Sequence, residues 1–107
     1  MLSAIQIQIT ELIAENSKGY SALYECEKAL AEAEYDLDTI EQKAFIGAQG
    51  TVADRTAIAR LKAAENRLQR DLRRAEMNRV RVKIKSIETG LMALGTQARL
   101  LQAEMKL

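Results

Sequence analysis

"FIGAQGTVAD", residues 45–54, is the stretch that decides the fold, because it contains the one clear turn signal in the sequence. Gly50 suits the left-handed conformation that commonly ends a helix, and Gly47 lies three residues before it. Thr51 is a favourable N-cap for a new helix, and Asp54 follows three residues later as an acidic variant of the capping box. The stretch therefore predicts two helices joined by a turn at residues 47–51.

The first arm, residues 2–46, has the pattern of a coiled coil. Apolar or small residues recur in alternating steps of three and four, which places them on one face of a helix. Asn16 on this face can set register or oligomeric state, and Gly19 predicts a bend or a weak joint, since glycine costs a helix about 1 kcal/mol relative to alanine. The predicted seam consists of Leu2, Ile5, Ile9, Leu12, Asn16, Gly19, Leu23, Cys26, Leu30, Ala33, Leu37, Ile40 and Ala44.

The second arm, residues 52–106, carries the same rhythm in two sets. Between Ala75 and Val80 the step is five residues, which predicts a local slip of the seam and a relaxed supercoil. The first set is Ile58, Leu61, Leu68, Leu72 and Ala75, and the second is Val80, Ile84, Ile87, Leu91, Leu94, Ala98, Leu101 and Met105.

The stretch "RVRVKIKSI", residues 79–87, alternates basic and apolar residues, as a half-buried strand would. Its neighbours on both sides keep helical spacing, so we predict a helix in which Val80, Ile84 and Ile87 point inward and Val82 meets another chain. Residues 5–10, "IQIQIT", alternate as well. A pair of strands at the open end of the hairpin is therefore the alternative.

Composition supports an all-α fold of one domain, residues 1–107. The chain is 48% hydrophobic but has no proline and only five glycines, too few turn formers for a sandwich or barrel. We predict a long antiparallel two-helix hairpin, and because two helices enclose little core, a four-helix-bundle dimer or larger oligomer. Tyr20 and Tyr24 form either part of the interface or an exposed recognition patch. The predicted oligomer interface is Ile5, Ile7, Ile9, Tyr20, Tyr24, Val82 and Leu91.

Charge is divided along the chain although the net charge is only +1. Residues 1–50 hold nine acids and three bases, whereas residues 51–85 hold eleven bases and four acids. Opposite charges beside the seam favour antiparallel pairing of the arms. Residues 79–85 should lie beside residues 13–19, where Glu15 is the only acid. The basic strip predicted to follow a nucleic-acid backbone is Arg67, Arg70, Arg74, Arg79, Arg81, Lys83 and Lys85.

Catalytic and metal-binding motifs are missing from the sequence. There is no histidine, no glycine-rich phosphate loop and no nucleophile elbow. Cys26 is a single seam thiol, and the acids between residues 32 and 41 point in different directions on a helix. We therefore expect no enzyme activity, cofactor or metal. The sequence has the pattern of neither a signal peptide nor a membrane span, so we expect a cytoplasmic protein.

Residues 43–55, "KAFIGAQGTVADR", resemble the turn of small coiled-coil hairpin proteins encoded by tailed bacteriophages. The resemblance covers about a dozen residues closely and the rest of the chain in pattern only. It implies an accessory protein of DNA recombination or replication, or an inhibitor of a host nucleic-acid enzyme.

Three non-enzymatic functions are compatible with these residues. The first is an oligomeric hairpin that binds nucleic acid or a nucleoprotein through the basic second arm. The second is a protein inhibitor of a host defence or repair enzyme, acting through the acidic first arm and its tyrosines. The third is a structural coiled coil that serves assembly alone.

Overall fold

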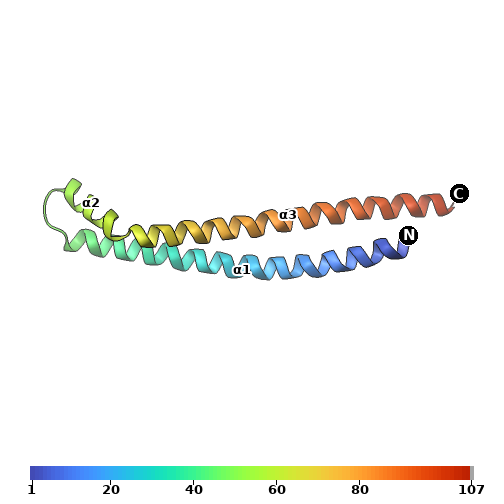
Figure 1. Ribbon diagram of the computed structural model, residues 1–107, viewed down its shortest axis with the longest axis horizontal. Helices are drawn as coiled ribbons and strands as arrows, with labels where there is room; N and C mark the ends of the chain where they lie inside the picture. Colours follow the sequence, from blue (N-terminus) through green and yellow to red (C-terminus); the bar gives the residue numbers. More distant parts are fainter. Residues whose placement is uncertain (107) are drawn as a thin grey trace. The chain divides into compact units, whose positions relative to one another are not determined.

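The structure of the protein, a computed structural model, describes residues 1–106 and is built from α-helices. Helix α1 spans Leu2–Gly47, α2 spans Val52–Lys62 and α3 spans Ala64–Lys106 (Figure 1). No strand occurs in this part of the chain, so the strand alternative for residues 5–10 and 79–87 is wrong. The two predicted arms are confirmed, but the second arm is interrupted at Ala63.

The chain divides into two compact units. The turn unit is Glu25–Asn78, and it contains the second half of α1, all of α2 and the beginning of α3. The terminal unit combines Met1–Tyr24 with Arg79–Leu107, so the beginning of α1 lies beside the end of α3. Within each unit the two arms run antiparallel (Figure 1).

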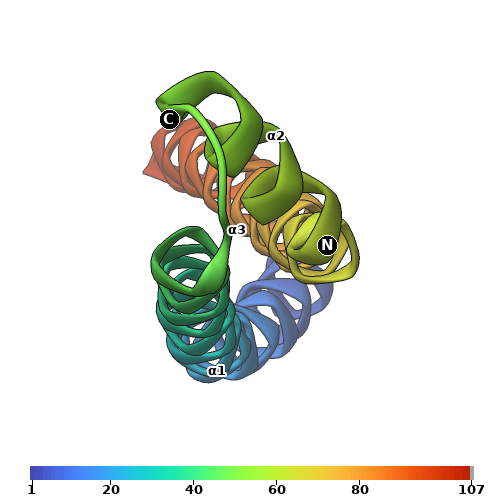
Figure 2. The ribbon, with the colours of Figure 1, turned by 90° about the vertical axis from the view of Figure 1, so that its left-hand side faces the viewer.

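The turn has the predicted capping chemistry. Gly50 has a φ of +112°, a conformation that L-residues with side chains rarely adopt. The Asp54 backbone N–H donates to the Thr51 hydroxyl at 3.2 Å, and the Thr51 backbone N–H donates to the Asp54 carboxylate at 3.2 Å. This capping box begins α2, and the chain crosses from α1 to α2 through residues 48–51 (Figure 2). The predicted turn is confirmed, with α1 continuing one residue further, to Gly47.

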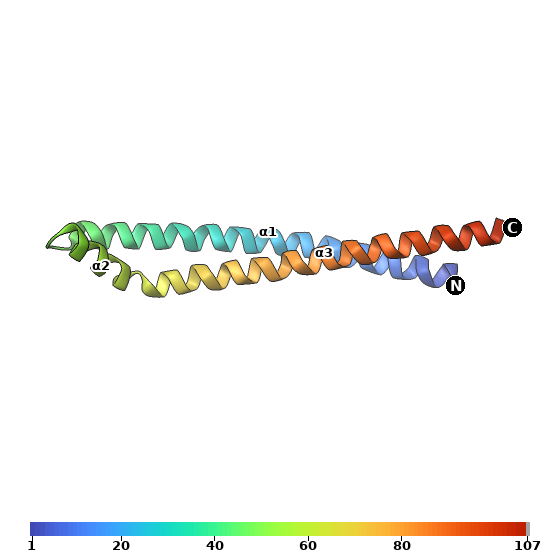
Figure 3. The ribbon, with the colours of Figure 1, turned by 90° about the horizontal axis from the view of Figure 1, so that it is seen from above.

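The break between α2 and α3 occurs at Ala63, where α2 is tilted against α3 (Figure 3). Ala63 has φ −93° and ψ 4°, yet its N–H still donates to the Ala59 carbonyl at 3.0 Å. Ala59 and Ala63 are both fully buried, and their small side chains permit a close approach of the arms near the turn. Beside the break, a guanidinium N–H of Arg67 donates a hydrogen bond to the Arg60 carbonyl oxygen, with 3.5 Å between nitrogen and oxygen.

The predicted seam of the first arm is confirmed at every position except Ile40, which is exposed. Leu30 and Leu37 are its most buried members, and the others are half-buried. Asn16 lies on the seam as predicted, and its Oδ1 atom is buried without a hydrogen-bond partner in the described chain. A polar side chain at a seam position disfavours other registers of the two arms. Its buried, unpaired oxygen lowers stability.

The predicted seam of the second arm is half wrong. Val80, Ile84 and Ile87 point inward as expected, and Val82 is exposed. The five residues of the first set are exposed instead of inward-facing: Ile58, Leu61, Leu68, Leu72 and Ala75. The buried and half-buried positions there include Ala59, Ala63, Asn66, Arg70 and Met77, which continue to Val80 in steps of three, four and seven, and Arg67 beside Asn66 is half-buried as well.

The slip predicted between Ala75 and Val80 is therefore wrong as well. Met77 is buried and carries the seam from Arg70 to Val80 without a five-residue step. The error arose because the leucines form a second apolar row with the same period on another face of the helix.

Gly19 allows close packing where the sequence predicted a bend. Helix α1 is unbroken at this residue. A Cβ atom added at Gly19 would lie 2.9 Å from Cγ1 of Ile84, a buried side chain on α3. The glycine therefore makes room for Ile84 between the arms of the terminal unit.

We expect Gly19→Ala to lower the free energy of unfolding by about 1 kcal/mol, because the overpacking outweighs the gain in helix propensity. Gly95→Ala is the matched control, since Gly95 is also helical and an added Cβ there meets no atom within 4 Å. This control should gain about 0.5–1 kcal/mol. Urea unfolding followed by circular dichroism measures both, and equal gains in the two variants would contradict the close contact at Gly19.

Candidate nucleic-acid interface

The stretch 79–85 of α3 presents its four bases on the outside of the terminal unit. Val80 is half-buried and Ile84 is buried, so the helix turns these side chains toward α1. Residues two apart on a helix point in directions about 160° apart, whereas residues four apart are neighbours. Arg79 and Lys83 therefore share one flank of the helix, and Arg81 and Lys85 share the other.

These like charges have few acids beside them. The terminal unit contains seven bases and four acids. Arg79, Lys83 and Lys85 make no ion pair with any residue that the structure describes. Like charges at i and i+4 destabilise a helix by about 0.2–0.5 kcal/mol per pair. Arg79, Lys83 and Lys85 thus form a positive surface that has no ion pair within the described residues.

The other predicted nucleic-acid-binding residues lie in the turn unit and are engaged within the chain. Arg67 pairs with Glu41 at 3.6 Å, and Arg74 pairs with Glu34 at 3.5 Å. Arg70 is half-buried and contacts the neighbouring Asp71 at 3.0 Å. Three of the seven predicted bases, Arg67, Arg70 and Arg74, therefore have ion-pair partners within the chain.

The two ion pairs between the arms also agree with the face of α3 that the structure turns toward α1. Glu34 and Glu41 are seven residues apart, as are Arg67 and Arg74, so the pairs repeat at the heptad spacing. Such exposed pairs contribute about 0–1 kcal/mol each, and they are compatible with the face of α3 that lies against α1. The matching spacing of seven was the signal in the sequence that could have corrected the second-arm seam.

Tyr20 joins the two arms of the terminal unit through its hydroxyl group. The Tyr20 O–H donates to the Glu88 carboxylate at 2.6 Å. This hydrogen bond, together with the negative charge of Glu88 and slight desolvation, raises the pKa of the Tyr20 phenol above its ordinary value. The Glu88 carboxylate keeps its negative charge in this hydrogen bond.

The other residues predicted for the oligomer interface are divided between the seam and the surface. Ile5, Ile9 and Leu91 are half-buried in the seam of the terminal unit. Ile7, Tyr24 and Val82 are exposed. Only the exposed residues are available to a second chain.

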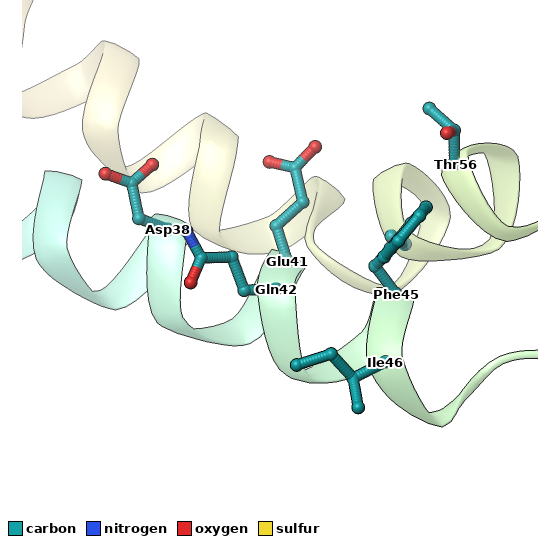
Figure 4. Close-up of a pocket in the computed structure, with 7 residues that line it drawn as sticks. Asp38, Glu41, Gln42, Phe45, Ile46 and Thr56 are labelled. Atoms are coloured by element: carbon teal, nitrogen blue, oxygen red, sulfur yellow. The ribbon is translucent and has the colours of Figure 1, made fainter. Parts of the chain in front are cut away.

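A surface hollow of about 460 Å³ lies near the turn (Figure 4). Phe45 lies between α1 and α2, while the carboxylates of Asp38 and Glu41 point toward the second arm. The Arg55 guanidinium stacks 4.4 Å from the centre of the Phe45 ring, and its Nε–H donates to the Phe45 carbonyl at 3.1 Å. These contacts fasten α2 to the end of α1. The lining residues are Asp38, Glu41, Gln42, Phe45, Ile46, Thr56 and Ala59.

The acids of α1 do not form a metal centre. No group of three His, Cys, Asp or Glu side chains within residues 1–106 is arranged to hold a metal ion. Cys26 is a free, half-buried thiol at its seam position. None of the described helices has the length and apolar character needed to span a membrane.

Comparisons with protein-family models, with curated proteins and with solved structures found no match to this chain. The resemblance of residues 43–55 to phage hairpin proteins therefore stays a prediction.

Proposed function

We propose that the protein is a non-enzymatic accessory factor of DNA metabolism that binds the nucleic-acid backbone through residues 79–85. One observation supports the proposal above all. Four bases occupy both outer flanks of two helical turns, and three of them, Arg79, Lys83 and Lys85, have no ion pair in the described chain.

The proposed binding is electrostatic and independent of base sequence. Residues 79–85 cover about 9 Å of helix at 1.5 Å per residue, a length that reaches only a few phosphates. All four aromatic residues are on α1, so α3 has none on which bases could stack. We therefore expect modest affinity that falls steeply with salt.

A salt titration with a fluorescent oligonucleotide tests the proposal. We expect Arg79→Gln/Lys83→Gln to weaken binding and to reduce the slope of log Kobs against log salt by about two, one for each lost phosphate contact. Arg99→Gln/Lys106→Gln is the matched control, because it removes the same charge from the same unit away from the stretch. This control should keep the wild-type slope.

Two results would remove the proposal. The first is a wild-type protein that does not bind at low salt. The second is an equal loss of slope in the control, because binding would then depend on net charge and not on residues 79–85.

A structural assembly role is the second candidate, and it is favoured by the apolar surface of α2 and α3. Leu61, Leu68 and Leu72 are exposed on the outside of the turn unit.

Inhibition of a host enzyme would use the acidic outer face of α1, on which Tyr24 and Tyr35 are exposed.

A further inference from the structure

Tyr20 lies at the end of one basic flank of α3. Arg81, Lys85 and Glu88 are spaced by four and three residues, so they share one side of this helix. The Tyr20 O–H donates to the Glu88 carboxylate at 2.6 Å, which places the phenol of α1 beside the helical turn that contains Lys85. Tyr20 is 51% exposed, so part of its side chain faces solvent next to the basic side chains.

Tyr24 continues the same side of α1. It follows Tyr20 by four residues, so the two side chains are neighbours attached about 6 Å apart along the helix. The arms of the terminal unit are antiparallel, and one turn forward from Tyr20 on α1 corresponds to one turn back from Glu88 on α3. Tyr24 is therefore level with residues 79–85, and it is 64% exposed.

The terminal unit thus presents two aromatic and two basic side chains together. Tyr20 and Tyr24 come from α1, Arg81 and Lys85 come from α3, and all four are exposed. Surfaces that bind single-stranded nucleic acid combine the same two elements, namely rings on which bases stack and cations that contact the phosphates. Helix α3 has no aromatic residue of its own, so the rings beside its bases are supplied by the opposite arm.

Stacking on these rings would distinguish single strands from duplexes. The bases of a duplex are already paired and stacked on one another, whereas those of a single strand are free to stack on a tyrosine. Each such contact changes affinity by a factor of about 5–150. The hydrogen bond to Glu88 holds Tyr20 in place before binding, which reduces the entropy lost on binding. Because the Glu88 carboxylate repels phosphate, we expect the backbone to lie over Arg81 and Lys85.

We propose that Tyr20 and Tyr24 stack with bases of single-stranded DNA while Arg81 and Lys85 contact its phosphates. The inference rests on the proposed binding by residues 79–85 and names the form of DNA that is bound. The preference for single strands is independent of base sequence, because every base has an aromatic face. Glu88 is a positioning residue that acts through Tyr20.

Titration of a fluorescent single strand and of a duplex of the same length tests the preference. At equal low salt the wild type should bind the single strand about tenfold more tightly. Tyr24→Leu should lower the single-strand affinity by about tenfold and leave the duplex affinity and the salt slope unchanged, because no charge is lost. Tyr35→Leu is the matched control, since Tyr35 is an exposed tyrosine of α1 in the turn unit, and it should bind as the wild type does.

Two variants of Tyr20 separate stacking from the contact between the arms. Tyr20→Phe keeps the ring and removes the hydrogen bond to Glu88, so it should retain most of the single-strand affinity. Tyr20→Leu removes both and should lower the affinity by about tenfold. Circular dichroism checks that each variant is helical. Equal losses in the two variants would overturn the stacking role of Tyr20.

Tyrosine fluorescence detects stacking while both rings are present. The chain has three tyrosines and no tryptophan, so the emission of a Tyr35→Phe variant comes from Tyr20 and Tyr24. Saturation with an unlabelled single strand should quench this emission, because the bases cover the rings. Unchanged emission at saturation would overturn the proposal.

These measurements separate the inference from the function on which it rests. Equal binding of single strand and duplex, with tyrosine variants that match the wild type, overturns the stacking inference. If Arg79→Gln/Lys83→Gln still reduces the salt slope in that case, the proposed function stands without it. A wild type that binds neither form at low salt overturns both.

Discussion

Replacing Ile84 with alanine is expected to lower the free energy of unfolding by about 3 kcal/mol. Ile84 is only 6% exposed, and its Cγ1 atom packs against Gly19 of the other arm. Removing the side chain takes apolar surface out of the contact and leaves a cavity, because the backbone at Gly19 has no side chain to fill it. Urea unfolding monitored by circular dichroism measures the loss.

Met92→Ala is the matched control for Ile84→Ala. Met92 is on the same helix and unit, its side chain has the same number of heavy atoms, and it is 75% exposed. Its replacement should change stability by less than about 0.5 kcal/mol. Similar losses in the two variants would show that α3 does not turn Ile84 toward α1.

The contact between Gly19 and Ile84 also predicts coupling between two substitutions. In an Ile84→Ala background, Gly19→Ala should change from destabilising to stabilising, because the alanine methyl no longer meets Cγ1. Independent, additive effects would contradict a direct contact.

Replacing Gly50 with alanine is expected to cost about 2–3 kcal/mol. The φ of +112° at Gly50 is strained for any residue with a side chain. An added Cβ would also lie 2.9 Å from Oδ2 of Asp54, the oxygen that accepts the Thr51 N–H. The substitution therefore strains the turn and disturbs the cap of α2 together.

Gly47→Ala is the control for Gly50→Ala. Gly47 is the last residue of α1, and an added Cβ there has no atom within 4 Å. Its replacement should leave stability unchanged or raise it by about 0.5 kcal/mol. Thermal unfolding of both variants distinguishes the positions, and equal midpoints would mean that the turn does not require glycine at residue 50.

Much of the candidate interface could be predicted from the sequence, but its extent could not. The surplus of bases at residues 79–85 follows from counting charges along two antiparallel arms. The same count could not show that Arg67 and Arg74 reach Glu41 and Glu34, because a side-chain pair depends on the rotation of both helices. The ion pairs of Arg67, Arg70 and Arg74 were therefore visible only in the structure.

The sequence by itself determined the two helical arms, the turn at Gly50 and Thr51, and the seam of α1. These features depend on local signals, namely the heptad period, the conformational freedom of glycine and a cap that spans four residues. They require no knowledge of the opposite arm.

Only the tertiary structure decided which row of the second arm faces α1. The row through Leu61, Leu68 and Leu72 has the same period as the row through Ala59, Ala63 and Arg70 but is more apolar, so hydrophobicity alone favours the leucines. The contacts between the arms favour the other row, because two small alanines permit close approach and two arginines reach glutamates one heptad apart. The face that a helix turns toward its neighbour depends on such contacts between residues distant in sequence. It is therefore determined only when both arms are packed together.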